Sequence, residues 1–111
     1  MEPTLVDGDR VLVDLWTLRR RAPRPGEVVV LSGPGDEPLV KRVAREPYFG
    51  SETYPPPTIP SESALEPAFI VLGDNRGASR DSREFGRVPQ HCLRGRVLWR
   101  YWPVSRWGSI E

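Results

Sequence analysis

The chain has 111 residues, a formal net charge of +1 and 28% charged residues, which indicates one globular domain of ordinary composition. A single cysteine, Cys92, excludes an internal disulfide, and a single histidine, His91, excludes a histidine-rich metal site. The small net charge excludes a strong electrostatic attraction to nucleic acid, and no apolar run approaches the roughly 20 residues that a membrane span needs.

Short strands separated by turns are predicted for the first part of the chain. Residues 10–15 carry valines at alternate positions, and residues 27–31 form a continuous run typical of a strand buried on both faces. Residues 16–25, which lie between them, are expected to be a connection because an arginine cluster and two prolines occur there. A turn rich in glycine and proline at 32–38 then leads into a further predicted strand at 39–44.

Two more strands and two long loops are predicted for the second part. Residues 47–67 are expected to form an irregular surface loop, because their prolines break the hydrogen-bond ladder of a sheet. A strand is predicted at 68–72, a polar loop at 73–86, and a final strand at 94–102 that Pro103 ends. Helix signals are weak throughout. The sequence therefore predicts an all-β (mainly β) fold, a compact sandwich or barrel with long loops and little helix.

Lys41 is the only lysine in a chain that has fifteen arginines. It shares a face of its predicted strand with Leu39 and Val43, because side chains alternate across a strand. If that face is buried, desolvation lowers the pKa of the lysine toward the range that a general base requires. If the face is solvated, the amine extends into water and has no such role. The strand pattern alone leaves both interpretations open.

One segment of the second polar loop is dense in small polar residues. Residues 73–83 read G-D-N-R-G-A-S-R-D-S-R, and F-G follows at 85–86. Such a loop can hydrogen-bond its own backbone and hold one shape, and Asp81 could pair with Arg83 to lock it. Composition alone favours a structural turn without chemistry.

Four blocks, in order, resemble the type I signal peptidases, a family that includes the mitochondrial inner-membrane proteases. The G-D-N-x-x-x-S-x-D-S-R motif with its following F-G resembles the C-terminal signature of that family. Residues 1–5 (M-E-P-T-L) resemble the end of the S-M-x-P-T-L nucleophile box, and residues 25–31 resemble the G-D-I-V-x-F strand, with Glu27 in place of the commoner Asp. Residues 40–43 (V-K-R-V) resemble the strand that carries the general-base lysine. The resemblance covers nearly the whole chain.

The resemblance implies a role for each matching residue. Lys41 matches the lysine that takes the proton from the nucleophilic serine, and Ser79 matches the serine whose hydroxyl orients that lysine. The positions that support the site are Asp74, Asn75, Asp81, Ser82 and Arg83. The positions that line the substrate groove are Met1, Pro3, Thr4 and Leu5. A neutral lysine can activate a serine without a histidine, so this Ser/Lys dyad implies no cofactor.

The resemblance also implies parts that lie outside this chain. The nucleophilic serine is expected immediately before Met1, and the membrane anchor of the family is expected upstream of that serine. We therefore interpret residues 1–111 as a single signal-peptidase-like catalytic domain that lacks the anchor and the nucleophile. The chain as it stands is expected not to hydrolyse peptides by this mechanism.

The implied substrates are signal peptides of preproteins, with small residues before the cleavage site. Trp99, Tyr101, Trp102 and Trp107 cluster near the C-terminal end, and such side chains favour a membrane surface. The implied location is the outer face of the bacterial cytoplasmic membrane, with the mitochondrial inner membrane as the alternative. No nucleic acid and no metal are expected as partners.

Three other interpretations stay open at this point. The chain could be a catalytically inactive remnant that binds extended peptides by strand addition. It could be a dedicated maturation protease with a narrow substrate range, because only the loop at 47–67 stands where large members of the family carry an extra domain. It could also be a self-cleaving repressor domain, which shares the Ser/Lys chemistry, although the motif at 73–83 favours the peptidase.

Overall fold

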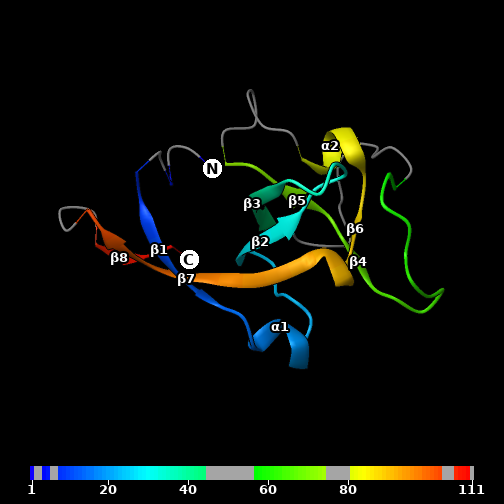
Figure 1. Cartoon of the computed structure of the whole chain (residues 1–111), viewed down its shortest axis with the longest axis horizontal. Coiled ribbons are helices and arrows are strands. Elements are labelled where there is room, and N and C mark those ends of the chain that lie inside the picture. The colour runs from blue at the N-terminus through cyan, green and yellow to red at the C-terminus, as the bar shows by residue number, and fades with distance from the viewer. Residues whose placement is uncertain (2–3, 6–7, 45–56, 75–80, 104–106, 111) are drawn as a thin grey trace.

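One antiparallel sheet dominates the computed structural model, which describes residues 1, 4–5, 8–44, 57–74, 81–103 and 107–110 (Figure 1). Its strands, in spatial order, are β1 (Arg10–Asp14), β7 (Leu93–Trp102), β2 (Val28–Ser32), β3 (Pro38–Val43) and β5 (Val71–Leu72), and β8 (Gly108–Ser109) also pairs with β7. A second sheet joins β4 (Ala68–Phe69) to β6 (Val88–Pro89). The helical segments are α1 (Thr17–Arg20), α2 (Ser82–Phe85) and the 3₁₀ turn η1 (Gln90–Cys92). The prediction of a mainly-β fold with little helix is confirmed.

The core lies on both sides of β2. We call the larger group the first core cluster; its buried members are Leu18, Val29, Leu31, Val43, Val71, Phe85, Val88 and Cys92. The second core cluster contains Val28, Val97 and Ile110. Val28 and Val29 enter different clusters because adjacent side chains of a strand point to opposite faces. The predicted burial of this strand on both faces is therefore confirmed.

A tight hairpin between β2 and β3 fixes the register of the strand that carries Lys41. Lys41 pairs with Val29 across the hairpin. In the turn, the Gly33 amide donates to the Glu37 carbonyl at 2.8 Å, and Asp36 has a φ of 63°. A Cβ atom on Gly33 would collide with the Glu37 side chain. A larger residue here would therefore require the Glu37 side chain to move.

The expected connection at 16–25 contains a short helix, α1, so that prediction was wrong in part. The Asp14 carboxylate accepts hydrogen bonds from the amides of Trp16 and Thr17 at 2.9 and 3.1 Å, and also from the Thr17 hydroxyl. These bonds satisfy amide groups that the first turn of a helix leaves without partners. Leu18 then anchors the helix in the first core cluster. Four residues are too few for an apolar period to reveal such a helix in the sequence.

The apolar run at 68–72 forms two strands instead of the single strand that was predicted. Its first part, β4, pairs with β6, and its second part, β5, pairs with β3. Ile70, between the two parts, is fully buried, and its carbonyl accepts a hydrogen bond from the Ala44 amide at 2.9 Å. The chain thus changes sheets at this residue, which single-strand periodicity does not reveal.

Three further predictions concern two loops and the last strand. The polar loop predicted at 73–86 contains α2, and the strand at 94–102 is not the last, because β8 follows it and pairs with β7. Of the loop predicted at 47–67, residues 57–67 are described and hold neither helix nor strand, while residues 45–56 lie outside the described part.

Candidate active site

Lys41 is buried, with 7% of its surface exposed. It lies on β3 between Leu39 and Val43 on the face that packs into the first core cluster. The neighbouring strands place Val29 directly opposite Lys41 and join β3 to β5. The buried interpretation of this strand face is therefore the correct one, and the solvated alternative is excluded.

Arg42, the next residue, points to the opposite face of β3 and binds Asp74. Its Nε donates to Asp74 Oδ1 and its second terminal nitrogen to Asp74 Oδ2, both at 2.9 Å. The remaining terminal nitrogen donates to the Gly26 carbonyl at 2.8 Å. This bidentate pair joins β3 to the start of the loop that follows β5. Sequence reasoning did not assign Arg42 a role; its position directly after Lys41 was the available signal.

The N-terminal segment reaches the same carboxylate. The Thr4 hydroxyl donates to Asp74 Oδ2, and the Thr4 carbonyl accepts a hydrogen bond from Arg100 on β7. Within the segment, the Leu5 amide donates to the Met1 carbonyl at 3.1 Å. Met1 and Leu5 pack their side chains against the second core cluster. Residues predicted to position the nucleophile are thus held beside the Lys41 strand.

Asp74 is the point where these three segments meet. The hydrogen bonds from Arg42 lower the pKa of this carboxyl; burial opposes that effect, and the bond from Thr4 adds to it. The net result is a pKa below the ordinary range. Asp74 is therefore ionised at neutral pH and holds both donors.

Asp81 closes the base of the loop. Its carboxylate, which is fully buried, accepts from the Gly73 amide at 2.9 Å and from the Arg83 amide at 3.0 Å. Two side-chain nitrogens of Arg83 complete the set, each at 3.0 Å. Burial alone would raise the pKa of Asp81, but these hydrogen bonds outweigh it and hold the pKa below its usual range. The pairing of Asp81 with Arg83 that the motif suggested is present, and we call it the Asp81 clasp.

Ser82 is also fully buried. Its Oγ accepts a hydrogen bond from the Val71 amide at 2.8 Å, which ties α2 to β5. The role of Ser82 as a site-supporting residue stays a prediction. Three other predicted site residues, Pro3, Asn75 and Ser79, lie outside the described residues. The contact expected between Ser79 and Lys41 stays a prediction.

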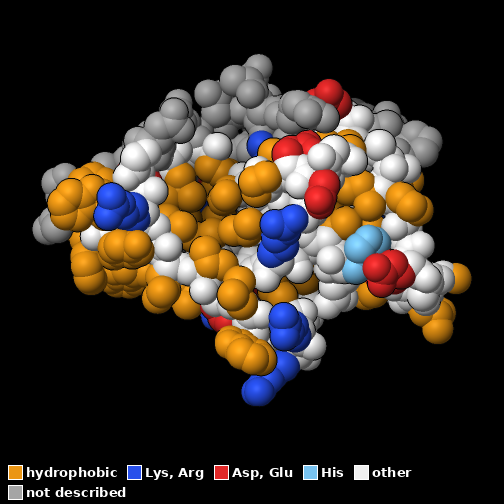
Figure 2. Space-filling view, viewed as in Figure 1, with side chains coloured by type: hydrophobic (Ala, Val, Ile, Leu, Met, Phe, Trp, Pro, Cys, Tyr) orange, Lys and Arg blue, Asp and Glu red, His pale blue; other side chains and the backbone are white. Residues whose placement is uncertain are grey.

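Large apolar side chains gather at one end of the molecule, over β1, β7 and β8 (Figure 2). We call this the aromatic patch; its exposed members are Leu12, Trp99, Tyr101, Trp102 and Trp107. Leu15 and Trp16 are exposed as well and lie between β1 and α1. The rings of Trp99 and Trp107 meet edge to face at 5.8 Å. The guanidinium group of Arg10 lies over the Trp102 ring and that of Arg19 over the Trp16 ring. In the part of the chain that the structure describes, every helix is too short or too polar to cross a membrane.

The sequence matches the family described as signal peptidase, peptidase S26, over residues 1–47 and 56–102. The matched ranges hold the strand of Lys41, the N-terminal segment and the loop that Asp81 closes. The agreement thus includes every described residue that the geometry brings together around Asp74 and Asp81.

Individual proteins give the same result. The chain is 32% identical to a Synechocystis sp. protein named "Probable signal peptidase I-2", over 99% of this chain and 62% of that protein. It is 30% identical to signal peptidase I of Leptolyngbya laminosa, with 99% and 68% covered, and 30% identical to signal peptidase IB of Staphylococcus aureus, with 95% and 74% covered. The chain therefore spans about three fifths to three quarters of the length of these relatives.

Proposed function

Because the chain belongs to the signal peptidase family, peptidase S26, we propose that residues 1–111 form the catalytic domain of a serine endopeptidase that removes signal peptides from exported preproteins. The nucleophile is a serine at the position immediately before Met1, and Lys41 is its general base. The substrates carry small residues before the scissile bond. The names of the relatives, all signal peptidases, support this assignment.

The observation that carries the proposal is the link from Thr4 through Asp74 to Arg42. Thr4 follows the proposed nucleophile position by four residues, and Arg42 is the neighbour of Lys41 on β3. A single ionised carboxylate thus holds the N-terminal segment beside the strand of the base. Because Lys41 and Arg42 point to opposite faces of β3, this link holds the N-terminal segment next to the strand on the Arg42 side. The serine before Met1 reaches the Lys41 amine from there, with Met1, Pro3, Thr4 and Leu5 along the substrate groove.

The burial of Lys41 supports its role as a base. The lysine is only 7% exposed as a residue, and burial disfavours a charged group. The neutral amine accepts the serine proton while the serine oxygen attacks the substrate carbonyl, and it then donates that proton to the departing amine. A water molecule, activated by the same amine, hydrolyses the acyl-enzyme.

The loop at 73–83 positions Ser79, the proposed partner of the general base Lys41. Ser79 orients the Lys41 amine through its hydroxyl, and Asn75 supports the loop from within. The support comes from the loop's two ends: the Asp81 clasp binds the Gly73 amide, and Ser82 binds the Val71 amide. Both anchors are fully buried, so the loop leaves and re-enters the fold at fixed points.

The aromatic patch is the surface that rests on the membrane. Tryptophan and tyrosine side chains favour the boundary between lipid and water. Arg10, which lies over the Trp102 ring of the patch, supplies positive charge for anionic lipid headgroups. The proposed location is the outer face of the cytoplasmic membrane, where exported preproteins emerge.

The test compares two forms of the protein in detergent. One is the chain from Met1 to Glu111, and the other is a longer form in which the upstream sequence, ending in serine, precedes Met1. The substrate is a preprotein with an Ala-x-Ala cleavage site. The longer form is also made as Lys41→Met, which keeps the buried volume but removes the amine, and as Arg94→Met, which removes a half-exposed cation of β7 as a control.

We expect cleavage by the longer form and by its Arg94→Met variant. We expect none by the Lys41→Met variant or by the chain that begins at Met1. Activity that survives Lys41→Met would overturn the role of this lysine. A folded longer form that binds signal peptides without cleaving them would favour the peptide-binding remnant.

A further inference from the structure

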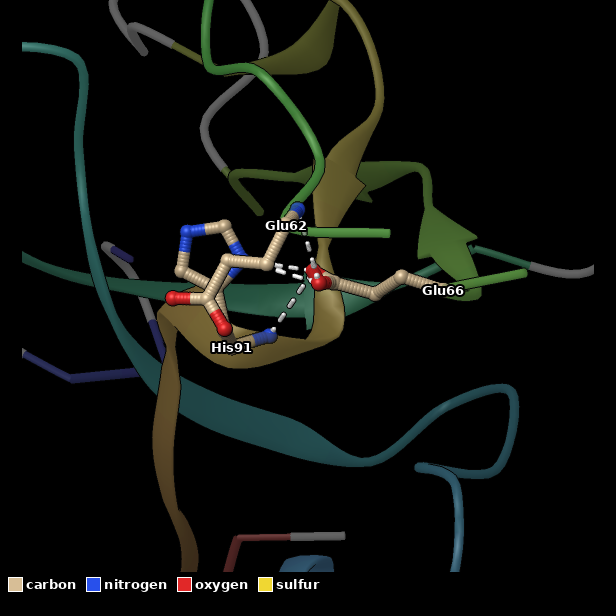
Figure 3. A group of neighbouring side chains, drawn as sticks. All are labelled: Glu62, Glu66 and His91. Carbon is tan, nitrogen blue, oxygen red and sulfur yellow. Dashed lines mark hydrogen bonds and ion pairs between the residues drawn. The ribbon is translucent and has the colours of Figure 1, made fainter. Parts of the chain in front are cut away.

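A histidine and two glutamates meet at the end of the molecule opposite the aromatic patch, where Figure 2 shows the single histidine beside an acidic side chain. His91 belongs to η1, and Glu62 and Glu66 belong to the segment before β4 (Figure 3). His91 Nδ1 lies 2.5 Å from Glu66 Oε1 and 3.0 Å from Glu66 Oε2. One ligand atom from each of the three residues can be chosen so that all lie within 4.8 Å of one another.

The backbone that carries the two glutamates is anchored at both ends. The Thr58 amide donates to the Phe85 carbonyl at 3.1 Å, and the Pro67 carbonyl accepts from the Gln90 amide at 2.9 Å. Between these points, the Glu66 carboxylate accepts from the Glu62 amide at 3.3 Å and from the His91 amide at 3.4 Å. The Glu66 side chain is only 11% exposed. The carboxylate is therefore held in place by its surroundings.

We propose that Glu62, Glu66 and His91 bind a divalent transition-metal ion of the zinc class. Imidazole nitrogen and carboxylate oxygen are ligands of such ions, and two carboxylates balance the charge of one divalent cation. Zinc–nitrogen and zinc–oxygen distances of about 2.0–2.2 Å place neighbouring ligand atoms of a tetrahedral site roughly 3.3 Å apart. Ligand atoms up to 4.8 Å apart must approach by about 1.5 Å, and His91 Nδ1 and Glu66 Oε1, which are 2.5 Å apart, must separate by about 0.8 Å. The ion takes the place of the proton that Nδ1 and Oε1 of the pair share, and that proton is released to solvent.

The three protein ligands leave one position for water. His91 also lines an open pocket of about 390 Å³, together with Ser32, Thr58, Ile59 and Cys92 among others. Solvent therefore reaches the ring of the ligand histidine. The ion would fasten the segment at 57–67 to η1, where the chain turns into β7. A metal was not expected from a sequence with one histidine and one cysteine, and the signal for this site is the pair of glutamates four residues apart.

The test measures binding of zinc chloride to the tag-free chain by isothermal titration calorimetry. Glu62→Gln is the decisive variant, because it removes one ligand and leaves the Glu66–His91 pair intact. His91→Gln removes the imidazole. Glu84→Gln, which changes an exposed glutamate of α2, is the matched control, and Cys92→Ser tests whether the nearby thiol captures the ion. Circular dichroism verifies that each variant is folded.

We expect one zinc ion per chain, bound at least tenfold more weakly by Glu62→Gln and by His91→Gln, and with unchanged affinity by Glu84→Gln and Cys92→Ser. Magnesium chloride should bind far more weakly than zinc, because an imidazole ligand favours the transition metal. No zinc binding, or equal binding by Glu62→Gln and Glu84→Gln, would overturn the proposal and leave an ion pair that only links two segments. Loss of binding in Cys92→Ser alone would assign the ion to the thiol and overturn it as well. These readouts do not depend on peptidase activity.

Discussion

Replacing Asp81 by asparagine tests whether the Asp81 clasp holds the loop at 73–83 in place. Asparagine has nearly the same size, so packing is unchanged, but it is uncharged and one of its two polar atoms is a donor. Four donors, from Gly73 and Arg83, point at this carboxylate. After Asp81→Asn, some of them face an N–H₂ group inside a fully buried site.

The magnitude follows from the burial of the two partners. Breaking a buried pair by removing one charge costs about 3–5 kcal/mol. Arg83 is 31% exposed and regains some hydration, so the lower end, about 3 kcal/mol, is expected. Unfolding entropy is about 2.1 cal/mol/K per residue, so this destabilisation lowers the melting temperature of a 111-residue chain by roughly 13 °C.

Thermal melts followed by circular dichroism at neutral pH measure the change. Asp36→Asn is the control: the Asp36 side chain is 87% exposed and 3.5 Å from Arg94, so its loss should change stability by less than about 0.5 kcal/mol. The difference between wild type and Asp81→Asn should also shrink in acid. The folded pKa of Asp81 is depressed, so its contribution is present above its unfolded pKa of about 4 and disappears as the pH falls below it. A destabilisation below about 1 kcal/mol at neutral pH would refute the reasoning.

Three more predictions concern other contacts. The pKa of Glu27 is lowered from 4.5 to about 2, chiefly by a hydrogen bond from Arg21, so the stabilisation by Glu27 is lost as the pH falls from about 4.5 to about 2. In acid titrations followed by circular dichroism, Glu27→Gln should therefore lose less stability over that range than the wild type, and an equal loss would contradict this. Thr4→Val removes a donor to Asp74, so it should lower the free energy of unfolding by about 1 kcal/mol and raise the pKa of Asp74 in a carboxyl titration by NMR; an unmoved Asp74 would count against the contact. Trp102→Ser should weaken co-sedimentation of the protein with phosphatidylglycerol vesicles. Leu65→Ser is the control, because Leu65 is 92% exposed and lies outside the aromatic patch, and it should not weaken binding. Equal effects of the two variants would refute the role of the patch in membrane contact.

The strands could be predicted where the apolar residues alternate regularly or form a continuous run. The continuous run that became β2 sits between two core clusters, and the hairpin to β3 follows from a glycine-rich turn. The burial of Lys41 could be given only as one of two alternatives, because a strand pattern shows which residues share a face and not which face is covered. The covering residues, such as Phe85 and Val88, come from more than forty positions later.

Short elements and long-range contacts could not be predicted. The helix α1 has four residues and β8 has two, so neither is long enough to show a hydrophobic period. The start of α1 depends on hydrogen bonds from its amides to Asp14. The contact between Thr4 and Asp74 spans 70 positions, and the one between Arg42 and Asp74 spans 32. Such pairs are fixed by how the strands assemble, and no local pattern encodes them. By contrast, Asp81 and Arg83 are two positions apart, and their pairing was visible in the motif.

The proposed chemistry depends on the register of β3. Lys41 and Arg42 are adjacent and point to opposite faces: one enters the first core cluster, and the other binds Asp74. A shift of one residue would exchange them, because the side-chain period of a strand is two. It would bury an arginine that stays charged and would break the link to Thr4. The β2–β3 hairpin fixes this register: Val29 pairs with Lys41 and Val28 with Arg42, and the Gly33 amide donates to the Glu37 carbonyl in the turn. The pairing of β3 with β2 thus decides which of the two neighbouring cations, Lys41 or Arg42, faces the first core cluster and can act as the base.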